Sequence, residues 1–208
     1  MNYKQTPLIH AIWLTDYVLM QRLLEGGADP NERNSDNQTP LFYAVNVDVD
    51  MVRILIDAGA DIHAADTNGT TVLMWSVGGM DRTSSVVQLL LNQGADATAS
   101  DKYGKTLLHY AVDVDGYESN MPECVRQILT LLIEAGADIE SRDRNGWTPL
   151  VLSVMMGTAD EVRILLDLGA DRSVTDFKTF NFCPGATNLL EAADTEPEKV
   201  RLLRDSEC

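Results

Sequence analysis

The side chains that could carry out chemistry are few, and they form no catalytic or metal-binding set. His10, His63 and His109 lie far apart in the sequence, and none of them neighbours a cysteine. Zinc ligands recur at short, characteristic spacings that are absent here, so we assign the histidines structural roles. The sequence also lacks a glycine-rich phosphate loop, a nucleophile elbow and a cysteine–histidine pair. We therefore expect no catalytic residue, no metal, no cofactor and no enzymatic activity.

One short segment resembles the start of a calcium-binding loop. Asp113 and Asp115 are followed by Gly116, in the order that such loops use. The later ligands and the closing glutamate are missing at the required positions. We therefore expect no calcium site.

The cysteines and the start of the chain indicate a cytoplasmic protein. Cys124, Cys183 and Cys208 are an odd number of residues without motif spacing, which favours a reducing compartment. The first repeat begins soon after Met1 and leaves no room for a signal peptide. No segment approaches the length of a membrane span.

The net charge limits the class of partner. Asp and Glu number 32 against 16 Lys and Arg, which gives a formal charge of −16. Nucleic acids and anionic membranes are themselves polyanions, so we expect the chain to bind neither. Two interpretations remain open: the charge attracts a partner with a basic surface, or it serves solubility alone.

A repeated pattern organises almost the whole chain. A Gly-Ala-Asp triplet follows a run of branched aliphatic residues five times, and a threonine opens a short apolar stretch about twenty residues before each triplet. The triplets begin at Gly27, Gly59, Gly94, Gly136 and Gly169, and the threonines are Thr6, Thr39, Thr71, Thr106 and Thr148. The threonines are 33, 32, 35 and 42 residues apart. Such a period is typical of a stacked solenoid.

Each repeat can be built from its residues. Threonine is a good helix N-cap and proline fits the first helical position, after which apolar residues follow at helical spacing. A second apolar helix ends at the glycine of the triplet, which can take the left-handed conformation. About ten polar residues lead to the next threonine, with turn signals at Asn68-Gly69 and Asn145-Gly146. The predicted unit is helix, turn, helix and extended turn.

These units resemble ankyrin repeats. Residues 101–111 follow the family pattern with only the proline lost, and residues 143–150 follow it with Val151 in place of the next histidine. His109 occupies the family's histidine position, where the side chain usually braces turns. Residues 187–193 and 200–203 resemble a decayed sixth copy. The resemblance implies an all-α ankyrin-repeat solenoid of stacked helix-turn-helix units with β-turn or hairpin fingers.

The predicted organisation is a single domain over residues 1–208 with six repeats, the last a degenerate C-terminal cap. Their approximate bounds are 1–33, 34–65, 66–100, 101–142, 143–175 and 176–208. The fourth repeat carries an insertion within residues 113–123, which is either a contact loop or a tolerated lengthening. Phe177, Phe180 and Phe182 precede the last repeat, where they either pack the cap or form an exposed anchor.

The resemblance also implies where a partner would bind. Ankyrin repeats usually meet partners with their turn tips and with the exposed face of each first helix, which together line a concave groove. Large apolar residues at such positions are candidate contacts, because aromatic residues and methionine suit interfaces. The predicted partner-binding residues are Trp13, Asn46, Tyr103, Asp113, Arg144, Trp147, Met155 and Met156. Trp13 could instead shield the N-terminal end, whereas Trp147, Met155 and Met156 are expected to lie outside the core.

The sequence therefore predicts a non-catalytic protein–protein interaction module, acting as a monomer and in a narrower version as an inhibitor. One alternative is an immunity protein that neutralises a basic toxin or enzyme. A second alternative is a substrate-binding or regulatory subunit of an enzyme.

Overall fold

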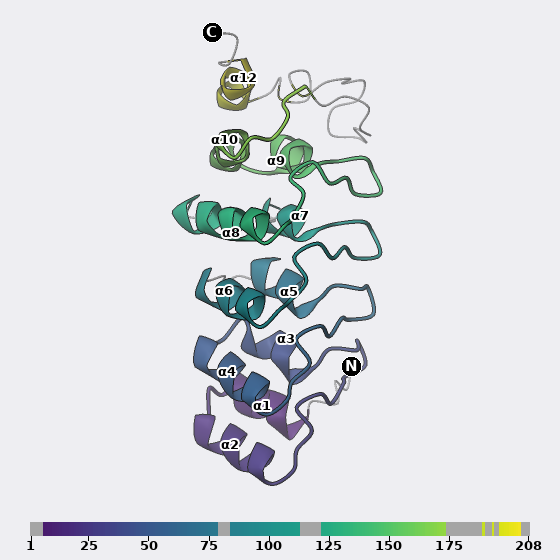
Figure 1. Ribbon diagram of the computed structural model, residues 1–208, viewed down its shortest axis with the longest axis vertical. Helices are drawn as coiled ribbons and strands as arrows, with labels where there is room; N and C mark the ends of the chain where they lie inside the picture. The colour runs from purple at the N-terminus through teal and green to yellow at the C-terminus, as the bar shows by residue number, and fades with distance from the viewer. Residues whose placement is uncertain are drawn as a thin grey trace. The chain divides into compact units, whose positions relative to one another are not determined.

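The computed structural model describes residues 6–78, 84–112, 122–173, 189, 193 and 196–204. Contacts within the chain divide it into an N-terminal unit, Met1–Lys102, and a C-terminal unit, Tyr103–Cys208. The described residues form helices in sequential pairs and no strand (Figure 1). This confirms the predicted all-α class. The single domain and the six repeat boundaries stay predictions.

The helices follow one another in pairs along each unit, as the repeat pattern predicts. The N-terminal unit contains α1 (Pro7–Trp13), α2 (Tyr17–Glu25), α3 (Pro40–Ala44), α4 (Val49–Asp57), α5 (Val72–Gly78) and α6 (Ser84–Asn92). The C-terminal unit contains α7 (Leu107–Val112), α8 (Pro122–Glu134), α9 (Pro149–Met156), α10 (Ala159–Asp167) and α12 (Pro197–Arg204). We call α1, α3, α5, α7 and α9 the first helices, because each opens a repeat.

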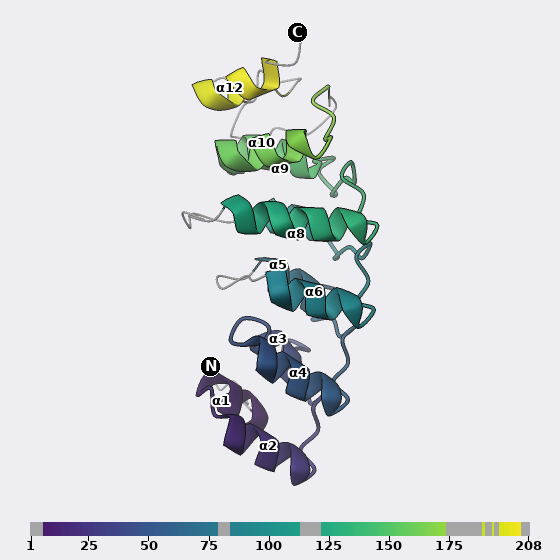
Figure 2. The ribbon, with the colours of Figure 1, turned by 60° about the vertical axis from the view of Figure 1, so that its left-hand side comes forward.

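Each unit buries a core between stacked helix pairs. In the N-terminal unit, α1 packs against α2 and α3, and α3 packs against α4 and α5 (Figure 2). Ile12, Phe42 and Met74 come from three successive first helices and are fully buried. In the C-terminal unit, α9 packs against α7 and α10. A single pair could not cover its apolar face, so each pair depends on its neighbours.

The threonine before each first helix acts mostly as predicted. Thr6 and Thr148 accept hydrogen bonds from the amides of Ile9 and Val151, both at 3.3 Å, and a proline follows each threonine. Thr39 has extended backbone at the N-cap but makes no such bond. The Phe42 amide instead donates to the Thr39 carbonyl oxygen at 3.1 Å, so the first turn of α3 is tight without the side chain.

The aspartate of every triplet fixes the turn that follows the second helix. Its carboxylate accepts a hydrogen bond from the amide two residues further on, at distances between 2.8 and 2.9 Å. The five aspartates are Asp29, Asp61, Asp96, Asp138 and Asp171. Gly59 illustrates the glycine's role, because its φ of +89° is the left-handed conformation predicted for a helix end.

Polar turns connect successive repeats, and we call them fingers (residues 30–38, 62–70, 97–105 and 139–147). In finger 62–70, the Asp66 carboxylate accepts from the amides of Asn68 and Thr70 at 2.7 and 2.9 Å. Asp143 does the same for Asn145 and Trp147 at 2.8 and 2.9 Å. These side-chain bonds supplement one backbone bond across each turn, from the Asp66 amide to the Thr70 carbonyl oxygen at 3.0 Å and from the Asp143 amide to the Trp147 carbonyl oxygen at 2.9 Å.

The described part of the last repeat is attached to α9 and α10. Lys199, on α12, is fully buried, and its ammonium donates to the Val154 carbonyl oxygen at 3.0 Å and to Glu196 at 2.8 Å. Val154 lies in the last turn of α9, where carbonyl groups lack helical partners. Arg163 and Glu198 form an ion pair at 2.8 Å. Phe177, Phe180 and Phe182 lie outside the described residues, so their packing stays a prediction.

Candidate functional site

Exposed apolar side chains gather on the first helices and their ends. Among the described residues, seven large apolar side chains are exposed, and only one of them lies on a second helix. Six belong to first helices, to the turns that follow them or to a finger: Trp13, Leu14, Val47, Trp75, Tyr103 and Met156. The seventh, Val18, lies on α2. Water is an unfavourable neighbour for such surface, so the first-helix side is a candidate binding surface.

Ring contacts order the aromatic residues of the N-terminal unit. Trp13, at the end of α1, is 51% exposed and meets Tyr43 of α3 edge to face, with ring centroids 5.8 Å apart. Trp75 of α5 is 39% exposed and meets the buried ring of Phe42 at 6.1 Å, also edge to face. Edge-to-face packing is the favourable arrangement of two rings, so each exposed indole has a defined orientation.

Hydrogen bonds tie Tyr43 to finger 30–38. Its hydroxyl accepts from Asn34 Nδ2 at 2.7 Å and donates to Gln38 Oε1 at 3.0 Å. The side-chain oxygen of Asn34, Oδ1, in turn accepts from the backbone amides of Asp36 and Gln38, both at 2.9 Å. These hydrogen bonds therefore join the finger to the first helix that follows it.

Tyr43 and Trp75 were missed by the sequence analysis. The predicted first-helix contacts lie seven or eight residues after a repeat threonine, whereas these two rings are four residues after Thr39 and Thr71. The signal was present, because Tyr110 occupies the same position after Thr106. His10 occupies it in the first repeat and is exposed.

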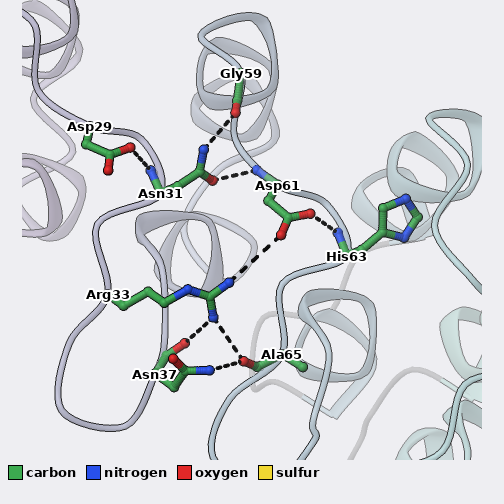
Figure 3. Close-up of polar contacts among 8 residues, drawn as sticks. All are labelled: Asp29, Asn31, Arg33, Asn37, Gly59, Asp61, His63 and Ala65. Carbon is green, nitrogen blue, oxygen red and sulfur yellow. Dashed lines mark hydrogen bonds and ion pairs between the residues drawn. The ribbon is translucent and has the colours of Figure 1, made fainter.

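Side chains of finger 30–38 bond to the backbone of the next repeat (Figure 3). Asn31 donates to the Gly59 carbonyl oxygen at 2.9 Å and accepts from the Asp61 amide at 2.7 Å. Glu140 repeats the second of these contacts in the C-terminal unit, where it accepts from the Asp171 amide at 2.7 Å. These bonds link one triplet to the next within each unit.

Arg33 and Asn37 extend this link further along the finger, and Figure 3 shows both side chains directed at the Ala65 carbonyl oxygen. Arg33 donates to this oxygen at 3.3 Å and Asn37 donates at 2.8 Å. The Arg33 guanidinium also lies 3.9 Å from the Asp61 carboxylate. Ordered fingers lose little conformational entropy when a partner binds, so their exposed tips are preorganised for recognition.

Neighbouring fingers also bond to each other through their backbones. The Thr67 amide donates to the Asp36 carbonyl oxygen at 3.0 Å, and the Arg144 amide donates to the Tyr103 carbonyl oxygen at 2.9 Å. Gly104 is needed beside the second bond, since it has φ +76° and an added Cβ would lie 3.1 Å from the Arg144 nitrogen. The exposed residues Tyr103 and Arg144 therefore belong to neighbouring fingers of the C-terminal unit that are joined by a backbone hydrogen bond.

The predicted partner-binding residues differ in how far their side chains are exposed. Trp13, Tyr103, Arg144 and Met156 are exposed, and Met155 is half-buried. Asn46 is half-buried, and its Oδ1 atom is inaccessible and accepts no hydrogen bond. Asp113 lies outside the described residues, as does most of the insertion.

The expectation that Trp147 lies outside the core is wrong. Its side chain is only 5% exposed, because the Asn145-Gly146 turn brings residue 147 back against the helices. Its amide donates to Asp143 Oδ1 at 2.9 Å, and its carbonyl oxygen accepts from the Asp143 amide at 2.9 Å. Residue 147 is therefore the base of its finger and not the tip.

His109 is fully buried and braces this finger, as the family resemblance implied. The Thr106 amide can only donate, and it lies 3.2 Å from His109 Nδ1, so Nδ1 accepts. The proton of the neutral ring is then on Nε2, which donates to the Trp147 carbonyl oxygen at 2.8 Å. The ring joins α7 to the finger 139–147, a structural role.

Two aspartates of the N-terminal unit, Asp48 and Asp96, have a pKa below the ordinary value and stay ionised at neutral pH. A hydrogen bond from the Tyr17 hydroxyl lowers the pKa of Asp48, and the amides of Asp50 and Met51 lower this pKa further. Hydrogen bonds from the Thr98 hydroxyl and amide lower the pKa of Asp96. Asp48 directly follows the exposed Val47, so a fixed negative charge lies at the border of the apolar surface.

The described acidic, histidine and cysteine side chains form no cluster that could hold a metal ion, since no three of them lie close enough together. His10 and His63 are both exposed on separate elements. None of the helices in this part of the chain combines the length and apolar character that crossing a bilayer requires.

Comparison with known proteins gives the family. The model described as "Ankyrin repeats (3 copies)" matches residues 1–66, 48–129 and 117–208. The B-cell lymphoma 3 protein homolog of Mus musculus is 32% identical over 194 residues, which are 91% of this chain and 33% of that protein. Protein phosphatase 1 regulatory subunit 27 of Homo sapiens is 48% identical over 54 residues, which are 26% of this chain and 32% of that protein. The chain thus spans about a third of the length of these curated relatives. Its repeats, helices and buried histidine agree with the match, and the chain belongs to the ankyrin repeat family.

Proposed function

We propose that this chain is a non-catalytic module that binds a protein partner through its first helices and finger tips. Ankyrin repeats are typically binding modules of this kind. The observation that carries the proposal is the distribution of exposed apolar side chains, six of seven of which lie on first helices, their ends or a finger. An apolar centre inside a polar rim is the usual arrangement of a protein interface.

The proposed contacts are the predicted residues that the fold leaves available. They are Trp13, Asn46, Tyr103, Arg144, Met155 and Met156, to which Asp113 is added from the sequence alone. Trp147 is not among them, because its side chain is buried at the base of the finger. We expect Trp13 and Met156 to contribute most, since large apolar anchors usually dominate binding energy.

The charge supports a narrower proposal, that the chain inhibits its partner by covering a basic surface. A formal charge of −16 would speed encounter with a positively charged partner and disfavour acidic ones. The name of the human relative, a phosphatase regulatory subunit, agrees with a role in regulating another protein. An immunity protein against a basic toxin would use the same surface and charge.

Affinity capture from the native host tests the main proposal. The full chain serves as bait beside Trp13→Ala, Met156→Ala and, as a matched control, Val18→Ala. Val18 is as exposed as Trp13 but lies on α2. We expect the two surface variants to lose the partner that the wild type and the control retain. Equal recovery by all four baits would show that the partner binds elsewhere.

A further inference from the structure

The first helices of the N-terminal unit present one aromatic ring per repeat. Trp13 comes from α1, Tyr43 from α3 and Trp75 from α5. Both indoles are more than a third exposed, and contacts with Tyr43 and Phe42 hold them in place. We call Trp13, Tyr43 and Trp75 the aromatic row. A row of oriented rings offers a partner π-electron faces at defined positions.

The described surroundings of the aromatic row contain carboxylates and no lysine or arginine. Helices α1, α3 and α5 and the turns 14–16 and 45–48 contain no lysine or arginine. Asp16 and Asp48 end these turns, and the lowered pKa of Asp48 keeps it ionised. Residues 1–102 contain 13 acidic and 6 basic residues, a formal charge of −7.

The described cations of this unit are placed on other elements. Arg33 bonds across to Asp61 and to backbone carbonyl groups, and Lys102 donates to the Thr67 carbonyl oxygen. Arg22 and Arg53 lie on the second helices α2 and α4. Among the described residues, an incoming cation would therefore meet rings and carboxylates at the aromatic row and none of the cations of this unit.

We propose that the aromatic row binds an extended, arginine-bearing segment of the partner protein. This inference rests on the proposed function, of which it names the surface and the chemistry. Guanidinium groups stack on aromatic faces, remain charged and are more weakly hydrated than ammonium groups. Arginine is therefore the cation that gains most from a surface combining indoles with carboxylates.

The spacing of repeats sets the spacing of arginines. Packed helices lie about 8–10 Å apart, and an extended chain advances about 3.3 Å per residue. Trp13 and Tyr43 touch, with ring centroids 5.8 Å apart, and so form one contact point, whereas Trp75 lies on the next first helix. Arginines three residues apart would therefore meet the Trp13–Tyr43 pair and Trp75. A segment with this spacing should bind more tightly than one with the same composition in adjacent positions.

An NMR titration of the isotope-labelled full-length chain with a synthetic peptide tests the inference. The probe is an unstructured glycine–serine peptide with arginine at every third position, and its match carries citrulline, which is neutral but similar in shape. The chain has three tryptophans, Trp13 and Trp75 in the row and Trp147 buried elsewhere. We expect the arginine peptide to shift the indole N–H signals of Trp13 and Trp75 but not that of Trp147, and the citrulline peptide to shift none.

Substitutions then measure the contribution of the rings. Trp75→Leu keeps an apolar side chain without an indole, and Val18→Ala changes exposed apolar surface outside the row. We expect Trp75→Leu to weaken peptide binding about three- to thirty-fold, and Val18→Ala to leave it unchanged. The melting temperature of each variant shows that the fold is retained.

Four outcomes would overturn the inference. Two are binding of the citrulline peptide as tight as that of the arginine peptide, and binding of the arginine peptide by Trp75→Leu as tight as by the wild type. The third is no shift of the indole signals at the highest usable peptide concentration. The fourth is a shift of the indole signals when the concentration of the chain alone is raised. The last outcome would assign the row to a second copy of the chain. If host capture depends on Met156 but on neither Trp13 nor Trp75, the inference fails while the proposed function stands.

Discussion

The Nε2 nitrogen of His109 donates a hydrogen bond to the carbonyl oxygen of Trp147 at 2.8 Å. This bond spans 38 residues and connects the first helix of one repeat to the finger of the next. On its other side the ring accepts from the Thr106 amide. One buried side chain therefore gives the Thr106 amide a partner and adds a second donor to the Trp147 carbonyl oxygen, which also accepts from the Asp143 amide.

Replacing His109 with leucine should destabilise the C-terminal unit strongly. The substitution removes the acceptor of the Thr106 amide and one of the two donors to the Trp147 carbonyl oxygen, and losing the partner of a buried polar group costs about 1–3 kcal/mol. We expect a lower urea midpoint with an unchanged slope. His10→Leu is the control, because His10 is exposed and surface changes usually stay within about 0.5 kcal/mol. Equal midpoints for the two variants would show that His109 does not brace the finger.

The buried Lys199 should hold α12 against α9. Lys199→Met keeps much of the apolar stem but removes both hydrogen bonds, so the Val154 carbonyl oxygen loses a charged donor. We expect faster hydrogen exchange in residues 196–204, with little change in α1 to α6. Arg201→Met is the control, since Arg201 is an exposed residue of the same helix. If both variants exchange alike, the buried ammonium is not what attaches the helix.

Stability of the N-terminal unit should fall in acid through Asp48. Its pKa is lowered below the ordinary value of 3.8 by the Tyr17 hydroxyl and by two amides. A lowered folded-state pKa contributes stability above the unfolded value, and this contribution is lost as pH falls through the folded value. Tyr17→Phe should raise the Asp48 pKa, measured by carboxyl NMR titration, and shift acid unfolding to higher pH. An unchanged Asp48 titration in Tyr17→Phe would exclude the hydroxyl as the main cause.

The repeating parts of the fold were predictable because local chemistry specifies them. The Gly-Ala-Asp triplet predicts a left-handed glycine, and each threonine predicts a helix start. Exposure was harder to predict, as Trp147 and Trp75 show. Whether a finger residue lies at the tip or at the base depends on the path of the turn, and Trp147 is at the base. Exposure of Trp75 depends on how its helix packs against α3, which a single repeat does not encode.

Association with a basic partner should slow as salt concentration rises. The charge of −16 would steer the encounter, and ions screen exposed charges beyond about 10 Å at 0.1 M salt. We expect stopped-flow association rates to fall with ionic strength while dissociation rates change little. An association rate independent of salt would leave the charge as a solubility feature.

Met156 and Trp147 should separate binding from stability. Both were expected at the partner surface, but Met156 is 45% exposed at the end of α9 whereas Trp147 is 5% exposed. Met156→Ala removes little buried surface, so we expect a nearly unchanged melting temperature and a partner affinity weakened by about 2 kcal/mol. Trp147→Ala removes a buried ring, and we expect unfolding to become easier by about 3 kcal/mol or more.

Measuring both quantities on both variants distinguishes the two roles. Affinity for the captured partner should be compared at a temperature where Trp147→Ala is still folded, because unfolded protein would imitate lost binding. At that temperature we expect the partner affinity of Trp147→Ala to be close to that of the wild type and the affinity of Met156→Ala to be lower. If folded Trp147→Ala loses more affinity than Met156→Ala, the binding energy resides at the base of the finger. The first-helix surface of the C-terminal unit is then not the contact.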